Sequence, residues 1–415
     1  MTSNIFYGWV VAACAFTILF LTYGAQYSFG VFVPAMLDDL GWTRASLGSV
    51  FSLYTVVYTS LSVVSGRLTD TLGPRRVIGI GALLLGAGLI LTSQISAPWQ
   101  MFFCYSLVAA LGMSTAYIPC NMTVVRWFVQ QRGRALGLAS AGASCGFLFT
   151  PLLAGYLISV TDWRTALLLL GFVLLILISF VARFMISGPE EIGEHPDGDK
   201  TKLELAHMSD SAAQIGLSFQ ESARTKTFWI FQLAFIVTML SLTVPFVHLV
   251  GHAQDIGIVG VRATLAISFI GLFSLIGSVV LGTLSDSLGR KTTMLIAATT
   301  QVVAFVLFLL ADGVFTLYCG AAAFGFFYGG FASLFPALVG DLFGRAHAGA
   351  IGGVIFGVGG ILGGWGPAIA GYLRDVHANF QLAFTCCAVS AALSVVLIGL
   401  LPRVSLYDTH TVTND

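Results

Sequence analysis

The sequence predicts an all-α membrane protein in which twelve transmembrane helices form two pseudo-symmetric six-helix bundles. Three observations predict this fold: the composition, the length of the apolar runs, and a sequence repeat at one fixed offset. Of the 415 residues, 57% are hydrophobic and only 9% are charged. Soluble proteins carry roughly 25% charged residues, and so apolar a chain would not remain solvated in a disordered state. Basic and acidic residues are equal in number, so no net charge favours nucleic acid.

The apolar runs are long enough to cross a bilayer as helices. A spanning helix needs about 20 mainly apolar residues, and its backbone groups must bond within the helix because lipid offers them no partner. No short alternating segments typical of a membrane barrel occur. The first run is too long for a signal peptide and lacks a basic start, so we expect it to be retained. The twelve runs are 8–36, 46–67, 76–95, 99–127, 134–159, 164–186, 228–253, 263–284, 292–311, 314–340, 349–373 and 380–402.

The basic residues predict the orientation of these runs. If the N-terminus is cytoplasmic, most of the 19 Lys and Arg residues lie on the inner side. The outer side then keeps only Arg44, Arg164, Arg262 and Arg374. Cytoplasmic loops are enriched in Lys and Arg, so we expect both termini in the cytoplasm and the protein in the plasma (inner) membrane.

One long polar stretch divides the chain near its middle. It predicts an N-terminal six-helix bundle at 1–186, a cytoplasmic linker at 187–227, and a C-terminal six-helix bundle with a short tail at 228–415. The second part of the linker, around residues 218–228, could form a helix lying on the membrane surface or could belong to a mobile tether.

The two halves of the chain repeat. The segment GRLTDTLG at 66–73 matches GTLSDSLG at 282–289, an offset of 216 residues. Pro151 followed by LAGYL matches Pro367 followed by IAGYL at the same offset. Two matches in one register predict a duplicated six-helix unit. In transporters, such duplication predicts a substrate site between the two bundles near the midplane.

This repeated loop resembles the signature loop of the major facilitator superfamily. The resemblance covers the whole chain and implies a secondary transporter with the major facilitator fold. Asp70 and Asp286 are expected at cytoplasmic helix ends beside Arg75 and Arg290. There they could pair with Arg or cap a neighbouring helix, and so hold one face closed.

Other segments resemble the monocarboxylate transporter and oxalate/formate antiporter branch of that family. They are YGWVV at 7–11, SFGVF at 28–32, RWF at 126–128 and RGRALGLA at 132–139. The branch often holds a carboxylate with a Lys in the first helix or a cation in the eighth or eleventh. In this chain the first-helix position is Tyr27.

Neutral side chains are therefore the candidate substrate ligands. Tyr117 and Asn121 are four residues apart and share one helix face. The resemblance implies binding tyrosines in the fourth and tenth helices, which indicates Tyr117 and Tyr328. Each tyrosine could instead pack between helices, and Trp365 could face lipid. The predicted substrate-binding residues are Tyr23, Gln26, Tyr27, Tyr117, Asn121, Ser140, Tyr328 and Trp365.

Two histidines are the candidate proton-coupling groups. His248 and His252 share a helix face, and a protonated His could supply the positive charge that a carboxylate needs. His248 could also lie further out, in an outer vestibule. Two His without a third ligand do not predict a metal site. Arg126 could guide anions at the inner mouth, where it would help to gate the path, or could reach the interface and form a salt bridge.

These observations predict a secondary active transporter rather than an enzyme, since neither a catalytic set nor a nucleotide-binding loop is present and no cofactor is expected. The predicted cargo is a small monocarboxylate or related organic anion, moved by alternating access with a proton or by exchange. We expect a monomer in the lipid bilayer, with no nucleic-acid partner. The alternative is a major facilitator carrier of a larger, mostly neutral compound. A membrane sensor that kept the carrier fold is a further alternative.

Overall fold

A computed structural model describes residues 6–128, 132–195, 217–344 and 348–402, and this part of the chain is helical without strands. The chain folds into two compact units. The first comprises Met1–Trp42 with Leu53–Ser211, and the second comprises Thr43–Ser52 with Ala212–Asp415. The boundary thus falls within one helix, after residue Ser52. The predicted all-α membrane fold is confirmed.

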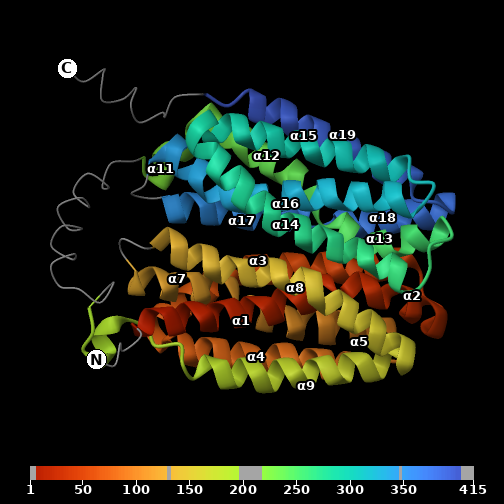
Figure 1. Cartoon of the computed structure of the whole chain (residues 1–415), viewed down its shortest axis with the longest axis horizontal. Coiled ribbons are helices and arrows are strands. Elements are labelled where there is room, and N and C mark those ends of the chain that lie inside the picture. Colours follow the sequence, from red (N-terminus) through yellow and green to blue (C-terminus); the bar gives the residue numbers. More distant parts are fainter. Residues whose placement is uncertain (1–5, 129–131, 196–216, 345–347, 403–415) are drawn as a thin grey trace. The chain divides into compact units, whose positions relative to one another are not determined.

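In the first unit, long helices pack in pairs. Helix α1 packs against α8, and α4 packs against α9, as Figure 1 shows. The elements are α1 (Tyr7–Tyr27), α2 (Phe29–Leu40), α3 (Arg44–Leu72, which begins in the second unit), α4 (Pro74–Thr92), α5 (Pro98–Met101), the π-helix η1 (Phe102–Ala109), α6 (Ala110–Met113), α7 (Tyr117–Trp127), α8 (Arg132–Val160), α9 (Trp163–Ala182) and the short 3-10 helix η2 (Pro189–Ile192).

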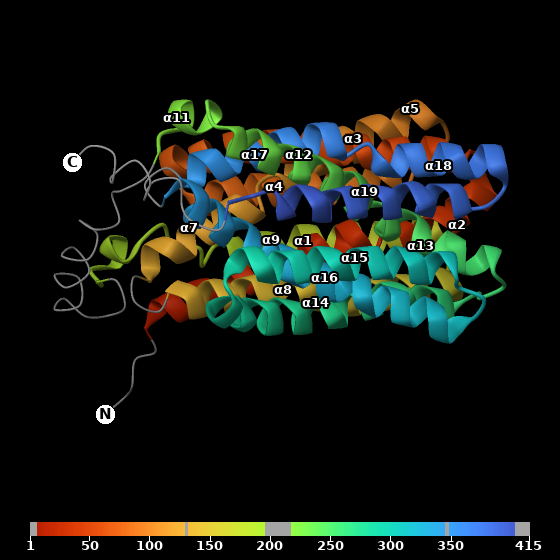
Figure 2. The same cartoon turned by 90° about the horizontal axis from the view of Figure 1, so that it is seen from above.

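The second unit repeats this arrangement. Helix α14 packs against α16, α12 against α17, and α15 against α19, and α14, α15 and α16 run alongside one another in Figure 2. The elements are α11 (Phe219–Ala223), α12 (Lys226–Leu242), α13 (Val244–Asp255), α14 (Val261–Leu288), α15 (Arg290–Leu309), α16 (Val314–Phe343), α17 (Ala348–Gly363), α18 (Gly366–His377) and α19 (Gln381–Gly399).

The helix starts follow the offset seen in the sequence. Helices α4, α5 and α8 begin at 74, 98 and 132, and α15, α16 and α17 begin 216 residues later, at 290, 314 and 348. The glycine before α4 and the glycine before α15 have the same backbone conformation, with φ of 79° at Gly73 and 81° at Gly289. Residues with a Cβ avoid this region, so the repeated loop needs glycine there to turn between helices.

Eleven helical segments within the described residues are long and apolar enough to cross a membrane. The twelfth predicted span coincides with α3, whose 29 residues are long enough to cross but include ten Ser and Thr. Several of these hydroxyl groups donate to carbonyls one turn back, as from Thr59 to Thr55 (2.7 Å) and from Ser62 to Tyr58 (2.6 Å). A helix can bury such groups because they find partners within it.

Four predicted spans are interrupted, where the apolar runs predicted continuous helices. The chain turns at Ser28 between α1 and α2, and it turns at Thr243 between α12 and α13. A π-helix and a turn divide the run that ends in α7, and residues 364–365 separate α17 from α18. Pro367, in the first turn of α18, lacks the N–H that a continuous helix would need.

Caps and linker segments complete the fold. The Asp162 carboxylate accepts the Thr165 hydroxyl and the Thr165 and Arg164 N–H groups at the start of α9, and these bonds, that from the hydroxyl first, hold the pKa of that carboxyl below its usual range. At the end of the predicted linker, Ser218 and Glu221 form a capping box that begins α11. Residues 196–216 of the predicted linker lie outside the described part.

Candidate functional site

Aromatic side chains from three helices meet in the first unit. Tyr23 and Tyr27 stack one turn apart on α1, with ring centroids 6.1 Å apart. Tyr23 meets Tyr117 of α7 edge-on at 6.3 Å, and Tyr27 meets Phe147 of α8 at 4.5 Å. The structure therefore brings three of the predicted binding residues into one cluster, near the middle of their spans.

Gln26 lies on the same turn of α1 and is 2% exposed. Its amide oxygen and nitrogen form no hydrogen bond of good geometry among the described residues, but the Tyr58 side chain of α3 lies close enough to interact with the amide. Leaving a buried polar group unbonded costs about 1–3 kcal/mol. An amide in this position is therefore suited to a polar ligand or a water molecule.

The start of α7 carries two further predicted residues. Tyr117 is 40% exposed, although its ring touches that of the buried Tyr23. The Asn121 side-chain nitrogen donates to the Tyr117 carbonyl at 3.0 Å, so these two residues share one face as expected. On α8, Ser140 is exposed, whereas Ser144 one turn further on is buried. A binding role for each of these residues stays a prediction.

In the second unit, Tyr328 lies near the middle of α16 and meets Phe246 of α13 edge-on, with ring centroids 5.5 Å apart. Trp365 is 43% exposed at the break between α17 and α18. Tyr328 thus lies on the element where the sequence predicted it, whereas Trp365 lies at an interruption of its predicted span, and the roles of both stay predictions.

Both candidate histidines bind backbone carbonyls. The His248 Nε2 lies 2.8 Å from the Pro367 oxygen, and the His252 Nε2 lies 3.0 Å from the Phe308 oxygen. A carbonyl oxygen only accepts, so each ring carries its proton on Nε2 and donates it. The His248 Nδ1 is buried and has no hydrogen-bond partner among the described residues. His252 packs edge-on against Phe384 at 4.8 Å.

The predicted gating residues are only partly described. The side chains of Asp70 and Asp286 lie outside the described part of the structure. Arg75, in the first turn of α4, and Arg126, in the last turn of α7, are exposed. Arg290 forms an ion pair with Asp341 of α16 at 3.2 Å and donates to a carbonyl of the same helix.

Two neighbours of the first-unit cluster were absent from the predicted site, Tyr58 and Phe147. Tyr58 could have been found from the sequence, since Tyr54 and Tyr58 are four residues apart on the most polar span. No sequence pattern distinguishes Phe147, because it is one of 33 phenylalanines in an apolar chain. Only the packing of α1 against α8 brings Phe147 to Tyr27.

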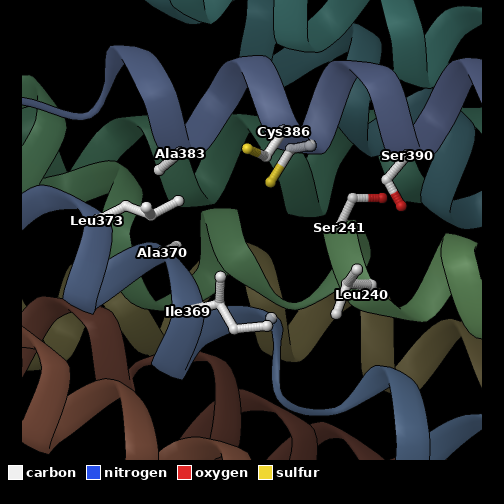
Figure 3. Close-up of a pocket in the computed structure, with 10 residues that line it drawn as sticks. Leu240, Ser241, Ile369, Ala370, Leu373, Ala383, Cys386 and Ser390 are labelled. Atoms are coloured by element: carbon white, nitrogen blue, oxygen red, sulfur yellow. The ribbon is translucent and has the colours of Figure 1, made fainter.

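A small groove in the second unit lies between α12, α18 and α19 (Figure 3). Its hydroxyl groups are already used by the backbone: Ser390 donates to the Val237 carbonyl at 2.7 Å, and Ser241 donates to the Thr238 carbonyl at 3.1 Å. The remaining lining is mostly apolar, so the groove is not suited to a carboxylate. It is lined by Leu240, Ser241, Gly366, Ile369, Ala370, Leu373, Ala383, Cys386, Cys387 and Ser390.

Comparison with known proteins identifies the chain's relatives. The sequence profile of the Major Facilitator Superfamily matches residues 15–258 and 230–411. Monocarboxylate transporter 13 of Rattus norvegicus is 30% identical over 389 residues, which cover 91% of this chain and 85% of that protein. The oxalate:formate antiporter of Oxalobacter formigenes is 27% identical, covering 82% of this chain and 78% of that protein.

Solved structures share the fold at low sequence identity. A bacterial homolog of the human lysosomal transporter Spinster, in an inward-facing unoccupied conformation, superposes with a TM-score of 0.69 at 14% identity, covering 97% of this chain and 95% of that one. The nucleoside transporter NupG gives a TM-score of 0.69 at 16% identity, covering 94% of this chain and 98% of that one. At these identities the likeness extends to the fold alone.

Proposed function

Because the chain belongs to the Major Facilitator Superfamily, we propose that it is a secondary active transporter of a small monocarboxylate or related organic anion, working by alternating access with a proton or by exchange. The chain is a multi-pass membrane protein and a transporter rather than an enzyme. We propose further that it acts as a monomer in the plasma (inner) membrane with both termini cytoplasmic. Its moving parts would be the bundles 1–186 and 228–415, joined by the linker 187–227.

The buried amide of Gln26 is the observation that carries this proposal. Its amide is a donor and an acceptor that forms no hydrogen bond of good geometry among the described residues, although the Tyr58 side chain is close enough to interact with it, and it lies on the same helix turn as Tyr23 and Tyr27. A carboxylate accepts hydrogen bonds from amide and phenol groups, and bonds to an ionised acceptor are the stronger kind. In this proposal Gln26, Tyr23, Tyr27, Tyr117 and Asn121 provide the ligands of the first unit. Ser140 of the first unit and Tyr328 and Trp365 of the second complete the set.

The names of the relatives support the same substrate class. Monocarboxylate transporter 13 and the oxalate:formate antiporter are both similar to this chain over most of their length. Their names describe small organic acids, and the cluster of neutral donors in the first unit is chemically suited to such ligands. The two observations are independent, because one comes from sequence similarity and the other from packing.

Uptake into vesicles tests the proposal. Vesicles containing the full-length protein are given labelled lactate, pyruvate or formate under an imposed pH gradient. Tyr117→Phe and Tyr328→Phe each remove a hydroxyl donor, so we expect uptake at low substrate concentration to fall about tenfold, as loss of a hydrogen bond to a charged group implies. Tyr156→Phe and Tyr372→Phe are matched controls, because these tyrosines are 60% and 61% exposed on α8 and α18.

The controls are expected to transport at the native rate. If Tyr117→Phe and Tyr328→Phe also run at the native rate while the protein is present in equal amount, these tyrosines do not bind the substrate. If the unaltered chain takes up none of the three acids, the substrate class is wrong.

The second candidate function is transport of a larger, mostly neutral compound. It is favoured by the placement of the cations: every Arg and Lys side chain that the structure describes lies within two turns of a helix end or in a loop. An anion is usually held by a cation in a membrane site, whereas a neutral substrate needs none.

A further inference from the structure

Helix α7 carries two of the proposed ligands, Tyr117 and Asn121, but it does not continue the helix before it. Residues 114–116 form a turn between α6 and α7. Pro119, in the first turn of α7, has no N–H with which to extend the helical bonds back across this turn. The direction of α7 is therefore not fixed by α6, and other contacts must hold the helix in place.

The indole of Trp127 holds the end of α7. Its Nε1–H donates to the Ile186 carbonyl at 3.0 Å, in the segment that follows α9, and the Trp127 side chain is 0% exposed. An indole nitrogen is a donor only, so the direction of this hydrogen bond is certain. A buried carbonyl that loses its donor is costly, so the bond resists both rotation and displacement of the helix end.

Aromatic rings from the start of α1 pack against the same helix end. The ring centroid of Tyr7 lies 5.4 Å from that of Trp127, and the centroid of Trp9 lies 4.9 Å from that of Phe128. The Tyr7 hydroxyl donates to the Phe184 carbonyl at 3.1 Å, two residues before the acceptor of the indole. We call Tyr7, Trp9, Trp127 and Phe128 the α7 anchor, and all of its contacts named here lie within the first unit.

The anchor and the ligands lie at opposite ends of one short helix. Tyr117 is ten residues before Trp127, which is about 15 Å along the axis. Residues three or four apart share a helix face, so Tyr117 and Asn121 lie on one face. Cys120, Val124 and Trp127 lie on a neighbouring face, which is buried. A rotation of α7 that breaks the indole bond would therefore turn both ligands and bring Cys120 out of its buried position.

We propose that Trp127 is a positioning residue for substrate binding, whose indole bond to the Ile186 carbonyl fixes the rotation of α7 and so the direction of Tyr117 and Asn121. The inference rests on the proposed substrate site and deepens it, since Trp127 acts through the ligands without touching the cargo. Without the indole bond, α7 turns about its axis and presents the phenol and the amide less well. Binding of the carboxylate then weakens, whereas the movement of the loaded carrier does not.

Labelling of a native cysteine tests the hold on α7 without any substrate. Cys120 is 0% exposed, so it should react slowly with a water-soluble maleimide in the purified full-length protein. Trp127→Phe keeps an aromatic ring but removes the indole N–H. We expect labelling of Cys120 to become about tenfold faster, as loss of a buried hydrogen bond implies. Mass spectrometry of peptides separates Cys120 from the other native cysteines, and the buried Cys387 of the second unit should label at the native rate.

Trp163→Phe is the matched control. Trp163 is a buried tryptophan of the same unit, 4% exposed, and its Nε1–H donates to the Asp39 carboxylate at 3.1 Å. The change removes the same ring volume and the same kind of donor, but at the start of α9 rather than on α7. Labelling of Cys120 should therefore stay at the native rate in Trp163→Phe.

Uptake kinetics test the consequence for binding. In vesicles given labelled lactate, Trp127→Phe should raise KM about tenfold and leave the maximal rate per folded molecule within about twofold of native. A merely structural role would lower the amount of folded protein and leave KM unchanged. Because Trp127 acts through Tyr117, the double variant Trp127→Phe/Tyr117→Phe should raise KM by less than the product of the two single effects. Trp163→Phe should keep the native KM.

Three outcomes would overturn the positioning role. The first is native labelling of Cys120 in Trp127→Phe, which would show that the indole bond does not hold α7. The second is equal acceleration in Trp163→Phe or at Cys387, which would mean general loosening. The third is faster labelling with an unchanged KM, which would show that the rotation of α7 does not matter for binding. Labelling does not depend on the cargo, so failure of the hold on α7 and failure of the monocarboxylate assignment are separate results.

Discussion

At the scale of single residues, the role that we propose for Gln26 would allow a site built from neutral groups to bind an acid and still release it. Its amide and the neighbouring phenols are neutral, so they bond a carboxylate without the strong attraction of a buried Arg. A carrier must bind its substrate well enough to load and weakly enough to unload. Neutral donors therefore suit a carrier whose substrate leaves at each cycle.

His248 supports a prediction on proton coupling. Its Nε2–H is bonded to Pro367, while its Nδ1 is buried without a partner in the described structure. A second proton on Nδ1 would need an acceptor, which a substrate carboxylate could supply. His248→Gln keeps a donor for the Pro367 carbonyl but cannot titrate. We expect this variant to fold normally. The additional uptake that an inward proton gradient produces should fall about tenfold, and uptake into vesicles with and without the gradient measures this difference.

His252→Gln is the control, because His252 is similarly bonded to a carbonyl and packs among phenylalanine rings. The sequence predicts coupling roles for both histidines, and we propose His248 as the coupling group because its Nδ1 has no hydrogen-bond partner among the described residues. If His248→Gln retains full stimulation by the gradient, His248 only anchors the backbone of α18.

At the scale of elements, the crossing of α1 and α8 depends on small residues. A Cβ on Gly146 would lie 2.9 Å from the Gly24 nitrogen and would also collide with the Phe20 carbonyl. Gly146→Ala therefore forces the two helices apart, and we expect it to destabilise the fold by about 1–3 kcal/mol. Thermal unfolding in detergent measures the effect.

Gly137→Ala on the same helix is the matched control, since its Cβ would meet nothing within 4 Å. Alanine also favours helix over glycine by about 1 kcal/mol. The control should unfold at the native temperature or slightly above it. If Gly146→Ala unfolds at the same temperature as the control, the close contact between α1 and α8 does not limit the stability of the fold.

The elements themselves could be predicted from sequence, but their interruptions could not. A helix needs a long apolar run to cross the hydrocarbon of the bilayer, and this requirement makes the position of each span visible in the sequence. A turn inside a run leaves the composition unchanged. At Ser28, for example, the hydroxyl donates to the Gly24 carbonyl at 2.6 Å, a bond that a continuous helix could also contain. Pro245 and Pro367 each lie in the first turn after an interruption, but Pro151 lies inside the continuous helix α8, so proline alone does not locate the turns.

At the scale of the whole molecule, the repeat predicted the architecture because duplication preserves helix starts across the offset of 216 residues. The residues of the candidate site were less predictable, because whether a residue belongs to the site depends on the direction of its side chain within a bundle. Tyr23, Gln26 and Tyr27 were predicted from polarity at membrane depth and Tyr117 also from the family resemblance, whereas Phe147 was missed because phenylalanine is common on every face. The hydrogen bond from the Ala45 N–H to the Asp375 carboxylate (2.7 Å) was also missed, since no local sequence pattern connects these two residues.

The placement of charge over the whole molecule leads to the last prediction. All Arg and Lys side chains in the described part lie near helix ends or in loops, so an acid in mid-membrane would be held by neutral groups. Such groups still distinguish charge, because an ionised carboxylate accepts stronger hydrogen bonds than an amide oxygen does. We expect unlabelled lactate to inhibit uptake of labelled lactate at concentrations about tenfold lower than lactamide requires. Equal potency of lactate and lactamide would contradict an anion carrier and favour the neutral-substrate alternative, and vesicles without the protein give the background for both.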